Sequence, residues 1–213
     1  MVRSDTDWVL EEILAEAERA TSSEARQYLL GAAHDGTFNR LHATLRISQA
    51  DPRWLELLRF LLGKLGSRSW IYREGMRDVW VIETTYRLNR LDHLPGEFER
   101  AAFARGYFDA EGGIPRNPSD RFYLQFVQKN HADLARLRSV LVHMGIGCGI
   151  LHNPSVRADP DYWRFYVLAR SHQEFISRIG SWHPRKRRLV NARSELECNK
   201  VAVRERAAGS PPF

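Results

Sequence analysis

Apolar residues recur at helical spacing in two segments of equal length, Gln49–Gly66 and Gln128–Gly145. Aligned without a gap, the two segments share a glutamine at the start, three leucines, an arginine and a glycine at the end. Helical periodicity explains the leucines, but not the shared glutamine and glycine. The pattern therefore predicts the same helix twice, beginning after a capping Asp51 or Asn130 and ending at the glycine. The alternative is a coincidence between two leucine-rich amphipathic helices.

Matches outside this helix extend the repeat in both directions. Asp35 corresponds to Glu111 and Trp80 to Trp163, and the sequence offset stays fixed within elements and changes between them. Offsets of this kind arise when a duplicated fold accumulates loop insertions. Each half is therefore expected to follow the order helix, strand, strand, helix, strand, strand.

The hydrophobic pattern places these elements approximately. Around the repeated helix, the first half is expected to have a helix at 23–34, a turn at 35–36 and strands at 40–49, 68–73 and 78–86. The second half is expected to have a helix at 97–110 and strands at 120–128, 147–152 and 161–169. Strict alternation in the strand at 40–49 puts Leu41, Ala43, Leu45 and Ile47 on one face and Arg40, His42, Thr44 and Arg46 on the other. One face should join a core, and the other is able to meet phosphates or bases.

Further helices are expected outside the repeat. An acidic amphipathic helix is predicted at 7–20, Ser171 and Glu174 have capping-box spacing for a short helix, and a basic helix follows from His183. The expected organisation is an N-terminal helix at 1–22, a first unit at 23–92, a second unit at 93–198 and a C-terminal tail at 199–213.

Charge and cysteine content narrow the class of protein. The chain has 32 lysines and arginines against 26 acids and a pI near 9.6, which favours a polyanionic partner but also suits many ordinary proteins. Cys148 and Cys198 lie far apart without a Cys-x-x-Cys pair, which argues against a disulfide framework or a cysteine zinc site. No apolar run reaches the about 20 residues of a membrane span. We therefore expect a soluble, intracellular protein that is not secreted.

Each half also places an acid directly after a helix rich in small residues. These acids are Asp35 and Glu111, and the small residues are Gly31, Ala32 and Ala33 in one helix and Ala101, Ala102 and Gly106 in the other. Small residues let two helix backbones approach closely, so the helices should pack side by side and bring the two carboxylates together. The glycine after each acid is expected to cap its helix in the left-handed conformation.

Two neighbouring carboxylates point to a metal centre. Hard cations such as Mg²⁺ or Mn²⁺ prefer oxygen ligands, and two carboxylates that hold them over a phosphodiester suffice for hydrolysis. The alternative is that Asp-Gly and Glu-Gly are only turn residues after helices.

The segment Ala104–Gly112 (ARGYFDAEG) resembles the nine-residue signature of the LAGLIDADG homing endonucleases, and Tyr28–Gly36 (YLLGAAHDG) resembles a weaker second copy. With the order of helices and strands, the resemblance covers roughly residues 24–195. It implies an α+β fold in which two pseudo-symmetric αββαββ(α) units form a saddle of antiparallel sheets over DNA, with the motif helices at the central interface. The implied function is site-specific, metal-dependent cleavage of double-stranded DNA by a monomer, in association with an intron or intein.

The resemblance also assigns residues to roles. It gives the metal to Asp35 and Glu111, and catalytic roles to Gln49, Gln128 and Lys186. From the residues alone, the glutamines read equally well as polar strand ends, and Lys186 as part of a solvated basic helix face. The residues expected on the DNA-facing surface are Arg40, His42, Arg46, Arg121, Tyr123, Gln125, Arg185 and Arg187.

The first half departs from the family pattern. It has Ala33 where the second half has Asp109, and its residue for orienting water is unassigned, with Arg87 and Arg90 as candidates. The segments from acid to glutamine are short in both halves, which predicts a short or permissive target site. Two alternatives to cleavage therefore stay open, a DNA-binding regulator that does not cut and an RNA-binding maturase whose partner is intron RNA.

Overall fold

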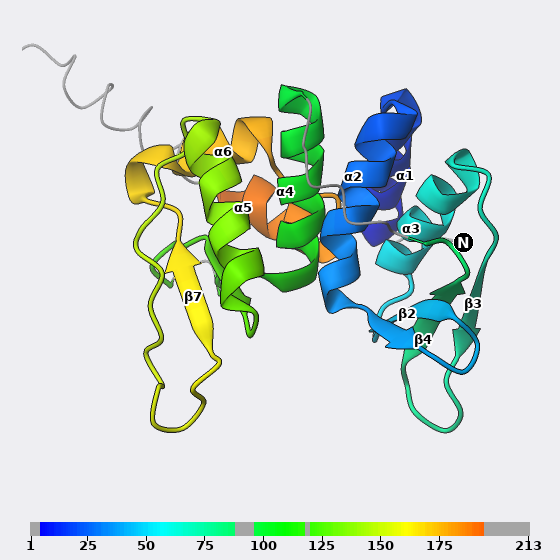
Figure 1. Cartoon of the computed structure of the whole chain (residues 1–213). Coiled ribbons are helices and arrows are strands. Elements are labelled where there is room, and N and C mark those ends of the chain that lie inside the picture. Colours follow the sequence, from blue (N-terminus) through cyan, green and yellow to red (C-terminus); the bar gives the residue numbers. More distant parts are fainter. Residues whose placement is uncertain (1–4, 88–95, 118–119, 194–213) are drawn as a thin grey trace, which may run out of the picture.

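The computed structural model describes residues 5–87, 96–117 and 120–193, and within them two similar sets of helices and strands follow each other along the chain (Figure 1). The elements of the first set are α1 (Asp5–Arg19), α2 (Ser22–Ala32), β1 (Thr37–Asn39), β2 (Thr44–Gln49), α3 (Arg53–Lys64), β3 (Ser69–Arg73) and β4 (Trp80–Thr84). Those of the second are α4 (Glu97–Glu111), β5 (Gly112–Gly113), β6 (Gln125–Gln128), α5 (His131–His143), β7 (Trp163–Tyr166) and α6 (His172–Arg178). One-turn 3-10 helices cover Ala33–Asp35 and Ala169–Ser171, and a further helix covers 184–193. The predicted helices are confirmed.

The strands form one antiparallel sheet in each half. The first sheet has the order β1-β2-β4-β3 and the second has the order β5-β6-β7. Cys148 and His152 add isolated bridges to the outer edge of β7, so the second half repeats the strand order of the first. The continuous strand predicted at 147–152 is wrong, because Gly147 and Gly149 interrupt it and glycine weakens a strand interior.

The strand predicted at 40–49 is also wrong in its first four residues. Residues 40–43 form a tight turn between β1 and β2, in which the side chain of Asn39 accepts a hydrogen bond from the backbone N–H of Leu41 at 3.1 Å. Leu41, expected in the core, is 85% exposed, and Ala43 has a φ of 52°. An asparagine side chain that bonds the backbone two residues ahead favours a turn over continued extension. In the second half, residues 121–124 are likewise irregular, and only Gln125–Gln128 form the predicted strand.

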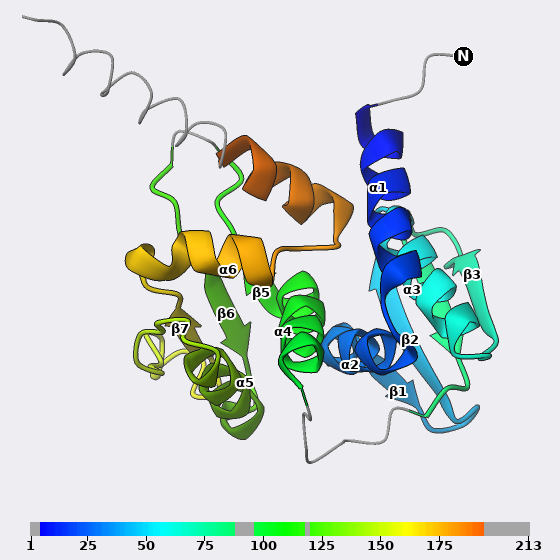
Figure 2. The same ribbon diagram turned by 90° about the horizontal axis from the view of Figure 1, so that it is seen from above.

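Helices α2 and α4 lie side by side at the centre of the molecule in both views (Figures 1 and 2). Their backbones approach as closely as the small residues predicted. A Cβ atom added to Gly31 would overlap the carbonyl oxygen of Phe103, and one added to Gly106 would overlap that of Tyr28. Glycine is therefore required at both positions by contact with the opposite backbone.

The duplicated helices begin and end largely as predicted. Asn130 accepts hydrogen bonds from the backbone of Ala132 and Asp133 at the start of α5. At the start of α3 the position before the helix is Pro52, and Asp51 accepts one backbone hydrogen bond, from Arg53 at 3.0 Å. Glycines with φ of 71° and 81°, Gly66 and Gly145, follow the two helices.

Two other local predictions are wrong. Gly36 and Gly112 are extended rather than left-handed. Glycine is needed at these positions because a side chain would not fit: a Cβ atom on Gly36 would lie 2.7 Å from the side chain of Leu45. The Ser171 hydroxyl does not cap α6, because it accepts a hydrogen bond from the backbone N–H of Gly147 at 3.0 Å instead.

Each half has its own apolar core, and each core includes a buried side chain from the other half. The first core includes Trp182 from the second half, and the second core includes Leu30 from the first. The helix at 184–193 and α1 lie on the same side of the paired helices α2 and α4 (Figure 2). Within the described ranges, no helix is long and apolar enough to cross a membrane.

Candidate active site

Asp35 and Glu111 occupy equivalent positions at the C-terminal ends of the two central helices. Asp35 closes the 3-10 turn that continues α2, and Glu111 is the last residue of α4. Because α2 and α4 pack directly against each other, both carboxylates lie at the same end of the interface. The predicted convergence of the two acids therefore follows from the close approach of the two glycine-containing helices.

Each acid is held by the glutamine of its own half. The side-chain amide of Gln49 donates to Asp35 Oδ2 at 2.6 Å, and that of Gln128 donates to Glu111 Oε1 at 3.2 Å. These glutamines end β2 and β6, so strand pairing fixes their positions. Among the described residues, the second oxygen of each carboxylate accepts no side-chain hydrogen bond.

Burial changes the pKa of both acids, and the pKa of Glu111 also responds to the charge of Asp35. Burial, and after it the nearby negative charge of Asp35, raise the pKa of Glu111 to about 6. Burial also raises the pKa of Asp35, against the hydrogen bond from Gln49 and the positive charge of Lys186. Two half-buried carboxylates in this relation are stabilised in their charged form when a cation binds between them.

Lys186 comes from the second half, and its positive charge acts on both acids, since it lowers the pKa of Asp35 and of Glu111. Its side chain is only 6% exposed, and its ammonium group donates to the backbone carbonyls of Phe108 and Asp109 at 2.5 and 2.8 Å. These carbonyls belong to the last turn of α4, where a cation is favoured by unpaired C=O groups. Burial lowers the pKa of Lys186 to about 8, while the charges of Asp109, Asp35 and Glu111 oppose that shift. The alternative of a solvated lysine is therefore wrong.

No protein-family model and no curated protein matches the sequence. Solved structures do match. The N-terminal LAGLIDADG domain of DUF199/WhiA has a TM-score of 0.64 at 18% identity, over 84% of this chain and 92% of that domain. I-DmoI in complex with DNA and Mn has a TM-score of 0.58 at 19% identity, over 75% of this chain and 98% of I-DmoI. The chain has the LAGLIDADG fold. Full-length DUF199/WhiA from Thermotoga maritima matches over 97% of this chain and 76% of its own, with a TM-score of 0.63.

Within this LAGLIDADG fold, Asp109 has a structural position that sequence reasoning missed. It is 2% exposed, and its carboxylate accepts hydrogen bonds from the Tyr28 hydroxyl at 2.6 Å, the Trp182 backbone N–H at 2.9 Å and the Ser181 hydroxyl. Trp54 in turn donates to the Tyr28 hydroxyl at 2.9 Å. This network ties the first half to the segment that leads to Lys186. The available signal was the contrast between Asp109 and Ala33 at equivalent motif positions.

The expected DNA-facing residues divide into several groups. Arg40 and His42 lie in the exposed turn between β1 and β2, Arg121 and Tyr123 lie just before β6, and Gln125 begins β6. Arg185 is exposed at the start of the last helix. Arg46 is paired with Glu74 at 2.7 Å, and Arg187 is paired with Glu16 of α1. Arg187 therefore holds the N-terminal helix in place, which is a structural contact that the basic run did not predict.

Among the described residues of the first half, no cation corresponding to Lys186 lies beside the acids. Arg87 is exposed and lines a hollow of about 570 Å³ with His34, Phe103 and Arg136, on the flank of the central helices. Arg90 lies outside the described residues, as do Cys198 and the tail at 199–213. Lys186 is thus the buried cation that the described residues place beside the two carboxylates.

Proposed function

We propose that this chain is a site-specific endonuclease of double-stranded DNA that acts as an intracellular monomer. The observation that carries the proposal is the pair of carboxylates, Asp35 and Glu111, each oriented by its own glutamine and coupled to the other by charge. One carboxylate from each half suits a duplex, in which two strands related by a two-fold axis must both be cut. The DNA complexes of I-DmoI with Mn and with Ca are consistent with this use of the fold.

The donor set fits Mg²⁺ or Mn²⁺. Mg²⁺ is usually bound by one or two protein carboxylates, with water and substrate phosphate completing its octahedral shell. Asp35 and Glu111 supply that number of carboxylates, and in the described ranges they are not part of a larger group of His, Cys, Asp and Glu able to hold a metal. When bound, the metal would lower the pKa of a water and neutralise charge on the leaving oxygen.

The protein residues would supply orientation and charge. Gln49 and Gln128 each donate to one carboxylate oxygen, so that the other oxygen of each acid would be left for the metal. Lys186 would place a positive charge beside the developing negative charge, at a pKa of about 8 that lets it hold or release a proton near neutral pH. Gly112 lets the chain leave α4 tightly, because a Cβ atom there would overlap the Phe108 ring.

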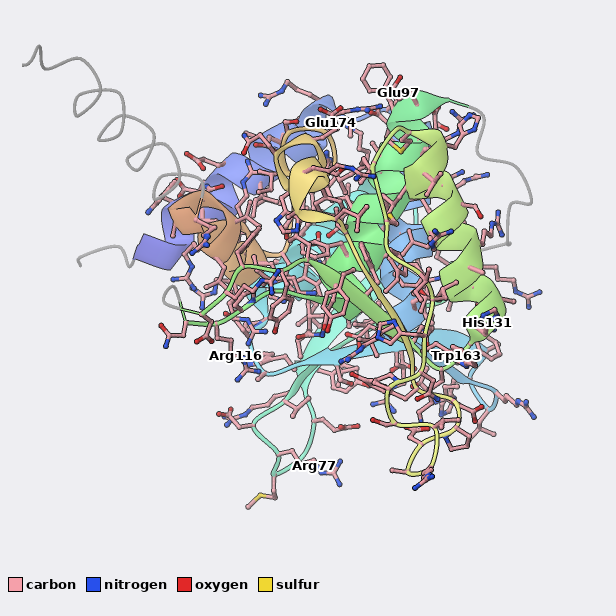
Figure 3. The ribbon with its side chains drawn as sticks, turned by 90° about the vertical axis from the view of Figure 1, so that its left-hand side faces the viewer. Arg77, Glu97, Arg116, His131, Trp163 and Glu174 are labelled. Atoms are coloured by element: carbon pink, nitrogen blue, oxygen red, sulfur yellow. The ribbon has the colours of Figure 1, made fainter. Side chains whose placement is uncertain are left out.

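The sheet faces turned away from the helices would bind the duplex. Both sheets lie on the same side of the central helices (Figure 1), and the β3–β4 loop with Arg77 extends in that direction (Figure 3). Arginines on such loops neutralise phosphates and position the protein without reading sequence. Arg40, Arg121 and Arg185 are exposed and would make contacts of this kind.

The proposal is tested by incubating the chain with a randomised duplex library, with and without Mg²⁺. We expect metal-dependent cleavage by the wild type, and a loss of about 10³-fold or more in Asp35→Asn and Glu111→Gln, since metal-bound charge stabilisation contributes several kcal/mol. Both substitutions preserve shape and remove charge. Tight, salt-sensitive duplex binding by the wild type without any metal-dependent product would overturn the nuclease proposal.

That same outcome would identify the second candidate, a DNA-binding regulator that does not cut. The observation that favours it is the long match to full-length DUF199/WhiA, which covers 97% of this chain, whereas I-DmoI covers 75%. The irregular segment at 121–124 also shortens the ribbon available to the major groove.

A further inference from the structure

The outer faces of the two sheets carry different chemistry at equivalent positions. Aligning the terminal glutamines pairs Arg46 of β2 with Gln125 of β6. Aligning Trp80 with Trp163 pairs Val81 and Glu83 of β4 with Arg164 and Tyr166 of β7. Cross-strand pairing then makes Arg46 the direct neighbour of Glu83, and Gln125 the direct neighbour of Tyr166.

On the first sheet, two nearby carboxylates neutralise the charge of Arg46. Arg46 forms an ion pair with Glu74 at 2.7 Å and lies 4.0 Å from a carboxylate oxygen of Glu83. Glu83 also accepts hydrogen bonds from the Thr44 hydroxyl and, at 2.9 Å, from the Tyr72 hydroxyl. The hydrogen bond from Thr44 is the main cause of its lowered pKa, so Glu83 is ionised at neutral pH. Two carboxylates against one guanidinium leave Arg46 without positive charge to offer a base or a phosphate.

On the second sheet, the side chain of Arg164 is held in place by the rings of His152 and Tyr166. Arg164 donates from Nε to Nε2 of His152 at 3.2 Å, and its guanidinium carbon lies 5.4 Å from the centre of the Tyr166 ring. His152 stacks on Tyr166 at 6.3 Å, and Tyr123 meets the same ring edge-on at 6.1 Å. Within the described ranges, no carboxylate forms an ion pair with Arg164. Its terminal amino groups are therefore available and already oriented.

We propose that the second sheet discriminates bases through Arg164 and Gln125, while the first sheet contributes little to sequence recognition. The proposal rests on the proposed binding of duplex DNA. An arginine held by Nε, with its two terminal amino groups still able to donate, fits the O6 and N7 acceptors of guanine in the major groove, and a glutamine amide fits adenine. The target is thus an asymmetric duplex whose specified bases lie under the second half.

The test is selection of bound duplexes from a randomised library without Mg²⁺, followed by affinity measurements at several salt concentrations. For the wild type we expect sequence preference concentrated in one half of the site. Arg164→Gln should lower the preference for one guanine by about 10-fold and leave other positions unchanged. Arg59→Gln is the matched control, because it removes the same charge from the exposed face of α3, where Arg59 pairs with Glu56.

Glu74→Gln provides the complementary measurement on the first sheet, because Glu74 forms the closest ion pair of Arg46, at 2.7 Å. Removing this carboxylate should release Arg46 toward phosphate, strengthen binding to all duplexes and steepen the slope of log affinity against log salt by about one unit. Equal sequence preference in both halves of the wild-type site, or a uniform loss across all sequences in Arg164→Gln, would overturn the asymmetry while leaving duplex binding intact. Absence of any salt-sensitive duplex binding by the folded wild type would overturn the proposed function as well.

Discussion

Each half has an acid held by a glutamine, Asp35 by Gln49 and Glu111 by Gln128, but the residues that surround these pairs differ. The second half supplies a buried lysine and a buried aspartate, Lys186 and Asp109, whereas the first half supplies Tyr28 and Trp54, which hold that aspartate. A simple account of the first half as a decayed copy does not explain this. Under the proposed function, both halves supply a metal-binding carboxylate, whereas the buried cation comes from the second half and part of its support comes from the first.

The largest effect that would sharpen this comparison is expected from Lys186→Met. Loss of a positioned acid or base typically costs 10² to 10⁴-fold, and the described part of the first half has no equivalent cation beside its acid, so we expect a loss of about 100-fold or more on one strand. Nicked circular DNA should accumulate when supercoiled plasmid carrying the target is followed over time.

Arg188→Met controls for charge and helix content, since Arg188 is exposed on the same helix. Equal slowing of both strands in Lys186→Met, with no nicked product, would show that the lysine serves both halves and would break the comparison.

The next effect concerns the one region where the halves are equal, the central helix contact. Gly31→Ala and Gly106→Ala each force a Cβ atom into the opposite backbone, and overpacking of this kind costs about 3 kcal/mol. We expect both variants to lower the free energy of unfolding in urea by similar amounts.

Gly63→Ala is the matched control, because Gly63 lies in α3 with no atom near its Cβ position. It should instead stabilise the protein, by about 1 kcal/mol, through helix propensity. A large loss in only one of the two interface variants would mean that the contact is not shared equally.

A third measurement compares the two acids through pH. The pKa of Glu111 is raised from its ordinary 4.5 to about 6 in the folded protein, so the folded state binds this proton more tightly than the unfolded chain. The free energy of unfolding of the metal-free protein should therefore fall as pH rises through this window, and stay low above it.

Urea unfolding at pH 4.5 and 7 checks this, with Mg²⁺ expected to restore stability at pH 7. Glu111→Gln should remove most of the pH dependence, and Asp35→Asn should remove the part that comes from the like charge. A Glu111→Gln variant with unchanged pH dependence would show that other groups govern it.

The smallest effect distinguishes the starts of the two duplicated helices. Asn130 accepts two backbone hydrogen bonds, whereas Asp51 accepts one. We expect Asn130→Ala to cost about 1 kcal/mol and Asp51→Ala to cost less, measured by thermal or urea unfolding. The reverse order would mean that the ion pair of Asp51 with Arg53 matters more than the cap.

The features that could be predicted from the sequence depend on neighbouring residues and occur once in each half. The repeated helix, its glycine stop and the acids after two small-residue helices each leave a pattern that recurs in the chain. The turn at 40–43 was missed because one side chain, that of Asn39, overrides an alternating pattern. The roles of Asp109 and Arg46 were missed because their partners, such as Ser181 and Glu74, lie far away in sequence.

The hydrogen bond between Tyr28 and Asp109 has a consequence for the history of this chain. Fold halves of this kind are expected to descend from a symmetric homodimer, and a gene can in principle be split to restore one. Here, a dimer of two second halves would place Ala104 where Tyr28 now stands, since the motif alignment equates these positions. Asp109 would lose the Tyr28 hydrogen bond in both copies and keep those from Ser181 and Trp182, so full pairing of this buried carboxylate depends on the fusion of two unlike halves.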